Sequence, residues 1–211
     1  MRKDLTEIVL VIDRSGSMNS CQDDAEGGIN TFIKEQKECV GEANLTLVQF
    51  DTEYEVVHNG TPIKDVGKYM LHPRGMTALF DATGRAINTV GERLQKMNEQ
   101  DRPGCVIVVI VTDGQENAST EFKKSQIKEM IERQKNVYNW QFTFLGADAD
   151  AFTEAVDIGI NAQSCGIYDA NHKAGIMYLV ASSQVSECRS ASLAGRALDN
   201  SFSQEDLRSI S

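Results

Sequence analysis

Three short stretches of the sequence combine acidic and hydroxyl side chains in a way that could bind a metal ion. They read Asp-Arg-Ser-Gly-Ser, Arg-Gly-Met-Thr and Thr-Asp-Gly, and their candidate ligands are Asp13, Ser15, Ser17, Thr77 and Asp113. Carboxylate and hydroxyl oxygens suit a hard divalent cation such as Mg²⁺, which takes oxygen ligands in an octahedron and retains some waters. Mn²⁺ and Ca²⁺ are further candidates. Zinc is disfavoured because the set contains neither His nor Cys.

The balance between hydroxyl and carboxylate ligands predicts how such an ion would act. If Ser15, Ser17 and Thr77 bind it directly while Asp13 and Asp113 act largely through water, the ion keeps much of its positive charge. We then expect it to bind an anionic group from outside, such as a Glu or Asp carboxylate of a partner protein. Two aspartates alone could equally be caps of backbone amides at strand ends. The three hydroxyl residues in register make that alternative less favoured.

The candidate ligands need secondary-structure elements that bring them together. Apolar segments alternate with amphipathic ones, which predicts strands over 7–12, 45–50, 54–58, 105–112, 141–145 and 163–168, and helices over 22–40, 78–97, 121–136, 149–158 and 171–188. This alternation predicts an α/β fold, an open, mostly parallel, doubly wound sheet of about six strands with helices on both faces. The short connection at 51–53 predicts one antiparallel edge strand. Because ligands of such folds bind at the carboxyl ends of strands, the three stretches should converge there.

Length and composition support a single globular domain. The chain has 211 residues and a net charge of -10, which disfavours a general nucleic-acid binder, since phosphates attract a basic surface. We expect one domain over 1–188 and a Ser-rich C-terminal tail over 189–211, either docked or disordered, with a short helix opening at Ser203. Five cysteines without a Cys-x-x-Cys pair indicate reduced thiols. With neither a signal peptide nor a membrane span apparent, we expect a cytoplasmic protein.

The order and spacing of the three stretches resemble the metal-ion-dependent adhesion site (MIDAS) of von Willebrand factor type A (VWA) domains. The Asp-x-Ser-x-Ser stretch at 13–17, Thr77 and the Thr-Asp-Gly stretch at 112–114 carry this resemblance. It implies that the five candidate ligands form the metal site and that the metal bridges to a partner protein. Binding in some members of the family is switched by movement of the C-terminal helix, and the resemblance implies that the helix at 171–188 is its counterpart here. The chain is more similar to free-standing intracellular members from bacteria and phages than to extracellular adhesive ones.

Neighbours of the candidate ligands are expected at the molecular surface. Met76 stands where glycine is common in the family, and we expect it to be exposed and able to contact a partner. Arg14 is expected to point out of its loop, where it screens the acidic rim or, alternatively, contacts an acid of the partner. Glu116 and Asn117 are interpreted as solvated residues ahead of a helix.

We expect no enzymatic activity. The chain has no Gly-x-Gly-x-x-Gly loop, no phosphate loop ending in Gly-Lys-Ser/Thr, and no Gly-x-Ser-x-Gly elbow. A metal-dependent phosphohydrolase with Asp13 as nucleophile stays an alternative, although such enzymes usually carry a second acid where this chain has Ser15. A structural subunit, whose metal only holds the three loops together, is a further alternative.

Overall fold

The architecture is built around one twisted sheet. The computed structural model describes residues 1–168, 174–204 and 206. Its strands follow the order β3-β2-β1-β4-β5-β6. All neighbouring pairs are parallel except β2 with β3, so β3 is an antiparallel edge strand. The bounds are β1 (Arg2–Asp13), β2 (Glu42–Phe50), β3 (Tyr54–Pro62), β4 (Pro103–Thr112), β5 (Gln141–Gly146) and β6 (Cys165–Ile167).

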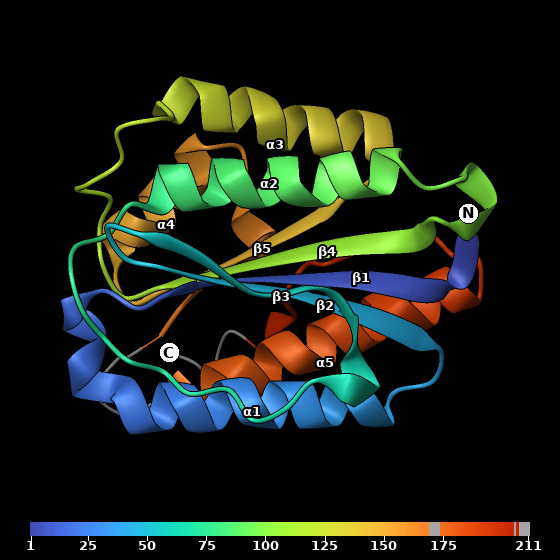
Figure 1. Cartoon of the computed structure of the whole chain (residues 1–211), viewed down its shortest axis with the longest axis horizontal. Coiled ribbons are helices and arrows are strands. Elements are labelled where there is room, and N and C mark those ends of the chain that lie inside the picture. The colour runs from blue at the N-terminus through green and yellow to red at the C-terminus, as the bar shows by residue number, and fades with distance from the viewer. Residues whose placement is uncertain (169–173, 205, 207–211) are drawn as a thin grey trace.

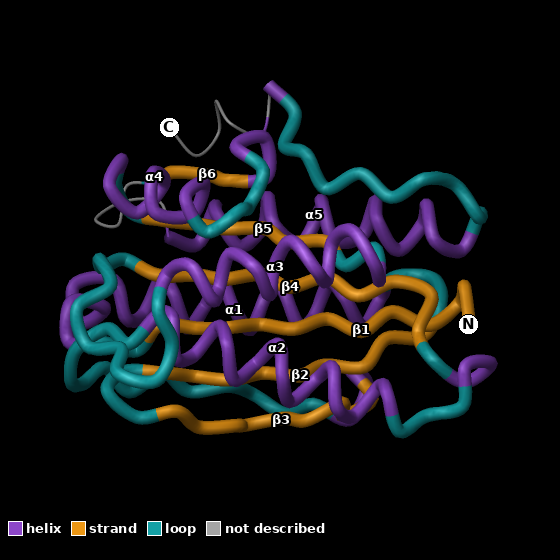
Figure 2. Tube along the Cα trace, turned by 90° about the horizontal axis from the view of Figure 1, so that it is seen from above, coloured by secondary structure: helices purple, strands orange, loops and turns teal. Residues whose placement is uncertain are grey.

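Helices cover both faces of this sheet (Figure 1). α1 and α5 lie on one face, and α2, α3 and α4 lie on the other, with the strands between the two helical layers (Figure 1). Figure 2, turned by 90°, shows the strands side by side from β3 at one edge to β6 at the other. The bounds are α1 (Gln22–Glu38), α2 (Leu79–Gln95), α3 (Lys124–Tyr138), α4 (Ala149–Asp157) and α5 (Ala174–Leu193). The predicted doubly wound α/β sheet with an antiparallel edge strand is confirmed. In the part of the chain that the structure describes, no helix has the length and apolar character that a membrane crossing requires.

Each face of the sheet has its own core, and β1 contributes to both. Ile8, Leu10 and Ile12 are buried in the cluster that includes α1 and α5, whereas Val9 and Val11 are buried in the cluster that includes α2 and α3. Because both faces are covered, the strand has a continuous apolar sequence rather than an alternating one. The same holds for β4, the most apolar strand, which pairs with β1 at the centre of the sheet.

This topology brings the predicted ligand loops together. The chain passes from β1 to β2 on one side, whereas β4 lies on the other side of β1. The carboxyl ends of β1 and β4 are therefore adjacent at the point where the strand order reverses, which is where ligands bind in open α/β sheets. Asp13 is the last residue of β1, and Asp113 is the first residue after β4.

α3 begins three residues later than its sequence pattern indicates, at Lys124 rather than Glu121. The cause is a distant carboxylate. Asp81, in the first turn of α2, accepts hydrogen bonds from the backbone N–H groups of residues 120–122 at 2.8–3.2 Å. These amides would otherwise open the helix, so Asp81 holds the segment in an extended approach to α3.

The segment after α5 packs against the domain. α5 continues beyond Cys188 to Leu193, and the first residues expected for its helix lie outside the described residues. Asn200 is buried and donates to the carbonyl oxygen of Phe142 at 2.7 Å, and Phe202 is also buried. The tail was expected to be either docked or disordered, and up to residue 202 it is docked against the domain. Ser203 and Asp206 cap each other's backbone N–H groups, as the expected helix opening requires.

Candidate metal centre

Asp13 is the most deeply buried of the candidate ligands. It ends β1 and has no exposed surface. Its Oδ1 accepts the backbone N–H of Ser15 at 2.6 Å, and its Oδ2 accepts the hydroxyl of Thr112 at 2.5 Å. Burial raises the pKa of Asp13 to about 6, although both hydrogen bonds favour the charged form. The carboxylate is thus fixed in orientation but lacks solvation.

A chain of hydrogen bonds links the two serines to the second aspartate. The hydroxyls of Ser15 and Ser17 lie 3.0 Å apart, and the Ser17 hydroxyl donates to Asp113 Oδ1 at 2.7 Å. Burial raises the pKa of Asp113, while the Ser17 hydrogen bond acts in the opposite direction. The loops after β1 and β4 are therefore joined by their candidate ligands.

Thr77 reaches the same place from the loop before α2. A Cβ atom built onto Gly114 would lie 3.0 Å from Thr77 Oγ1 and 3.6 Å from Ser17 Oγ. Both hydroxyls therefore border the small space beside Gly114, which a side chain at that position would enter. All five predicted ligand residues converge at the carboxyl edge of the sheet.

The electrostatics of this cluster fit a cation. Among the described residues, no Lys or Arg forms an ion pair with Asp13 or Asp113, so no cation from this part of the chain neutralises their charges. The described residues also hold no group of three or more His, Cys, Asp and Glu side chains suited to a metal. The donor set therefore consists of two carboxylates and three hydroxyls, which are hard oxygen ligands.

Two residues next to this cluster were not recognised from the sequence as structural supports. Asn117 Oδ1 accepts the backbone N–H of Thr77 at 2.9 Å, and the Thr77 carbonyl oxygen accepts the Asn117 N–H at 3.0 Å. Glu116 accepts the backbone N–H groups of Phe80 and Ser119 at 2.9 Å and 2.7 Å. Asn117 is exposed, as expected, and Glu116 is half-buried, but both residues also fix backbone segments near Thr77. The available sequence signal is an acid and an amide at 116–117, after Thr-Asp-Gly-Gln, but Thr77 and Phe80, which they support, are distant in the chain.

The expectation for Arg14 is also wrong. Its side chain does not point out of the loop, since the residue is only 4% exposed. Its guanidinium donates to Asp51 at 2.9 Å and to Glu55 at 2.6 Å, so it can neither screen the outer rim nor contact a partner's acid. Met76, by contrast, is 55% exposed, as expected.

Comparison with known proteins identifies the family. The family model for the von Willebrand factor type A domain matches residues 8–115, which is 108 of the 211 residues and includes all five candidate ligands. This chain belongs to the VWA family. Domains of this family are generally protein-interaction modules rather than enzymes. No curated protein matches the chain.

Solved structures support the VWA fold at low sequence identity. The VWA protein from Catenulispora acidiphila matches with 16% identity and a TM-score of 0.58, covering 89% of this chain and 42% of that one. Proximal thread matrix protein 1 from the mussel byssus, with zinc in its MIDAS motif, matches with 14% identity and a TM-score of 0.63, covering 86% and 46%. Manganese-loaded TRAP protein from Plasmodium vivax matches with 15% identity and a TM-score of 0.56, covering 84% and 73%.

These similarities establish the fold and a family in which the MIDAS can hold a divalent metal, zinc in one solved structure. The chain spans less than half the length of the mussel and Catenulispora proteins. What those larger proteins do as a whole is therefore not carried over to this VWA domain.

Proposed function

We propose that this VWA domain binds a divalent cation, with Mg²⁺ as first choice, through Asp13, Ser15, Ser17, Thr77 and Asp113. We further propose that the bound ion binds a Glu or Asp carboxylate of a partner protein, in assembly or regulation rather than catalysis. One observation carries the proposal. The buried carboxylate of Asp13, the half-buried carboxylate of Asp113 and three hydroxyls converge beside Gly114, and no Lys or Arg of the described residues pairs with either acid.

The hydrogen bonds explain how the residues would divide this work. A bound divalent cation supplies a positive centre that attracts an anionic group. The Ser17 hydroxyl donates to Asp113 and therefore accepts from Ser15, so one lone pair of its oxygen remains available to a cation. Asp13 is anchored by Ser15 and Thr112, which keeps a negative charge beside the hydroxyls. With hydroxyls rather than further carboxylates as ligands, the net charge of the centre stays positive enough to attract a partner's acid.

The nucleophile alternative gains no support from this geometry. Asp13 is fully buried, and each of its carboxylate oxygens already accepts a hydrogen bond. A nucleophile needs an oxygen that can reach a substrate.

Free thiols are the support for a cytoplasmic location, which we retain as a proposal. All five cysteines are unpaired, and four of them, Cys21, Cys105, Cys165 and Cys188, are buried. Unpaired thiols are typical of proteins in a reducing compartment.

Titration calorimetry with Mg²⁺ and Mn²⁺ tests the metal site. In Gly114→Ala, the added methyl group would lie 3.0 Å from Thr77 Oγ1, so we expect metal affinity to fall while the fold remains. Gly67→Ala is the matched control, because a Cβ at that loop glycine meets no atom within 4 Å. Equal metal affinity in Gly114→Ala and the wild-type domain would contradict the proposed site.

A pull-down with Mg²⁺ or with chelator tests the bridging role and separates it from a metal that only stabilises loops. We expect the partner to be retained with Mg²⁺, released by chelator, and lost after replacement of one of its own acidic residues. Thr77→Ala should weaken capture while barely changing thermal stability. Capture that survives metal removal in a still-folded domain would refute bridging.

A further inference from the structure

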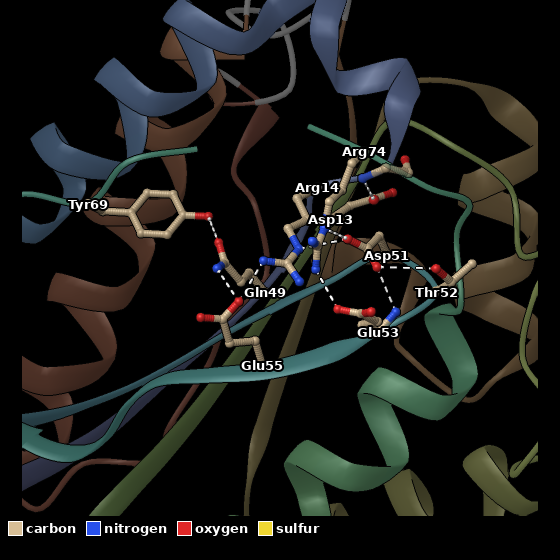
Figure 3. Close-up of polar contacts among 10 residues, drawn as sticks. Asp13, Arg14, Gln49, Asp51, Thr52, Glu53, Glu55, Tyr69 and Arg74 are labelled. Carbon is tan, nitrogen blue, oxygen red and sulfur yellow. Dashed lines mark hydrogen bonds and ion pairs between the residues drawn. The ribbon is translucent and has the colours of Figure 1, made fainter. Parts of the chain in front are cut away.

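A buried carboxylate joins the loops that carry the candidate ligands, although it is not one of them. Asp51 lies in the turn between β2 and β3 and is 1% exposed. Its Oδ2 accepts the Nε–H groups of both Arg14 and Arg74 at 2.9 Å, and its Oδ1 accepts the backbone N–H of Glu53 at 2.6 Å. Figure 3 shows the two guanidinium groups converging on this carboxylate. Its Oδ1 also accepts the Thr52 hydroxyl at 3.4 Å, so each oxygen accepts two donors and two arginines pair with the carboxylate. Asp51 is therefore not available as a metal ligand.

The two arginines come from different ligand loops. Arg14 lies between Asp13 and Ser15, and Arg74 precedes Thr77. The loops are also joined through their backbones, since the Arg74 N–H donates to the Arg14 carbonyl oxygen at 2.7 Å. A single carboxylate thus connects the first ligand loop with the second.

Asp51 holds the Thr77 loop on both sides of the candidate ligand. Arg74, which precedes Thr77, binds the side chain of Asp51. The N–H of Ala78, which follows Thr77, donates to the carbonyl oxygen of Asp51 at 3.1 Å. Gly75 brings the backbone close, because it has φ of +70° and a Cβ there would lie 3.2 Å from Asp51 Cβ. This left-handed turn favours glycine, and the close approach leaves little room for a side chain.

The contacts continue into the sheet edge, so the anchor is itself fixed. Arg14 also donates to Glu55 on β3, and Glu55 accepts from Gln49 on β2 at 2.9 Å. Tyr69, from the loop that leads to Thr77, donates to Gln49 at 2.8 Å (Figure 3). Asp51 is therefore part of a network that spans two strands and both ends of the Thr77 loop. We call Arg14, Asp51, Glu53, Glu55 and Arg74 the Asp51 cluster.

We propose that Asp51 is a positioning residue that fixes Thr77 relative to the 13–17 loop and thereby makes the site selective for a small cation. This inference rests on the proposed metal site. Mg²⁺ demands short, near-octahedral bonds, whereas Ca²⁺ accepts longer and more variable ones. Ligand loops held at a fixed spacing favour the former. Loosening the Thr77 loop should therefore cost Mg²⁺ binding more than Ca²⁺ binding.

Arg74→Ala is the most informative variant, because positioning and simple electrostatics predict opposite results. The Arg74 side chain is 54% exposed, so its loss should leave the fold intact. Removing a positive charge near the site would by itself strengthen the binding of both cations. Loss of positioning should instead weaken Mg²⁺ binding by about tenfold and Ca²⁺ binding by less than about threefold. Calorimetric titrations with each ion measure both affinities directly.

Two further variants test whether the effect acts through Thr77. In a double-mutant cycle, Arg74→Ala should weaken Mg²⁺ binding far less when Thr77→Ala is already present, since the ligand it positions is gone. Arg85→Ala is the matched control, because Arg85 in α2 is also a half-exposed, ion-paired arginine but binds Glu121, ahead of α3, rather than Asp51. It should leave the ratio of Mg²⁺ to Ca²⁺ affinity unchanged. An Asp51→Asn variant that folds should have a lower ratio of Mg²⁺ to Ca²⁺ affinity than the wild type. If Asp51→Asn does not fold, the Arg74→Ala titrations alone test the positioning role.

The outcomes separate this inference from the function on which it rests. A wild-type domain that binds neither ion would overturn the proposed metal site. A wild-type domain that binds Mg²⁺, together with an Arg74→Ala variant of unchanged or higher Mg²⁺ affinity, would overturn the positioning role and leave the metal site standing. Equal losses of Mg²⁺ and Ca²⁺ affinity would overturn the selectivity.

Discussion

Replacing Asp13 with Asn should stabilise the metal-free protein at neutral pH. Burial raises the pKa of Asp13 to about 6 from an ordinary value of 3.8, so the folded state binds a proton more tightly than the unfolded chain. Below about pH 3 the residue is protonated in both states and carries no penalty. Between about pH 4 and pH 6 the unfolded chain ionises while the folded state keeps the proton, so the fold loses stability, and the loss is complete once the buried carboxylate has also ionised above pH 6. At about 1.4 kcal/mol per pKa unit, the loss approaches about 3 kcal/mol at pH 7.

Urea unfolding in chelator at pH 4 and pH 7 measures this effect. The free energy of unfolding of the wild-type protein should fall across this range relative to that of Asp13→Asn, by up to about 3 kcal/mol. Asp65→Asn, at an exposed residue in a short 3-10 helix, is the matched control and should follow the wild type. Adding Mg²⁺ at about one hundred times its Kd should stabilise the wild type by about 3 kcal/mol and leave Asp13→Asn unaffected. An Asp13→Asn variant less stable than wild type at pH 7 in chelator would refute the reasoning.

Three further predictions concern the rest of the fold. In the native protein, only the half-buried Cys39 should react readily with a thiol reagent, because burial raises the pKa of Cys105, Cys165 and Cys188 to about 12; denaturation should expose all five thiols to labelling. Asn200→Ala should cost about 2 kcal/mol in urea unfolding by leaving the Phe142 carbonyl without its donor, whereas an unchanged midpoint would show that the tail is not docked in solution. Arg93→Ala should cost about 3 kcal/mol by removing the partner of the buried Glu7 carboxylate, and Glu7→Gln in the same chain should restore part of this loss.

The fold and the ligand convergence could be predicted because both depend on local pattern. Continuous apolar runs such as 105–112 distinguish strands covered on both faces, and the turn at 51–53 indicates the hairpin. The convergence of Asp13 and Asp113 then follows from the parallel topology, since Asp13 ends β1 and Asp113 directly follows β4, and these strands are neighbours at the centre of the sheet.

The supporting residues could not be predicted, because their roles depend on partners distant in the chain. Arg14 is drawn inward by Asp51, 37 residues away, and no local pattern distinguishes this from an outward arginine. Asp81 likewise delays α3 by accepting amides 39 to 41 residues away. Asn117 supports Thr77 across 40 residues. Short polar side chains have many possible partners, and only the packed topology selects among them.

The Asp51 cluster has a kinetic consequence for any acidic partner. The protein carries a net charge of -10, so an acidic ligand is repelled at long range. Arg74 is an exposed cation beside the ligand loop, but it pairs with the exposed Glu53 as well as with the buried Asp51, and the three acids of the cluster exceed its two arginines by one charge. An incoming carboxylate therefore meets no local excess of positive charge at the Asp51 cluster. Dissolved salt should shorten the range of the repulsion and speed the encounter, which reverses the ionic-strength dependence seen when oppositely charged proteins associate.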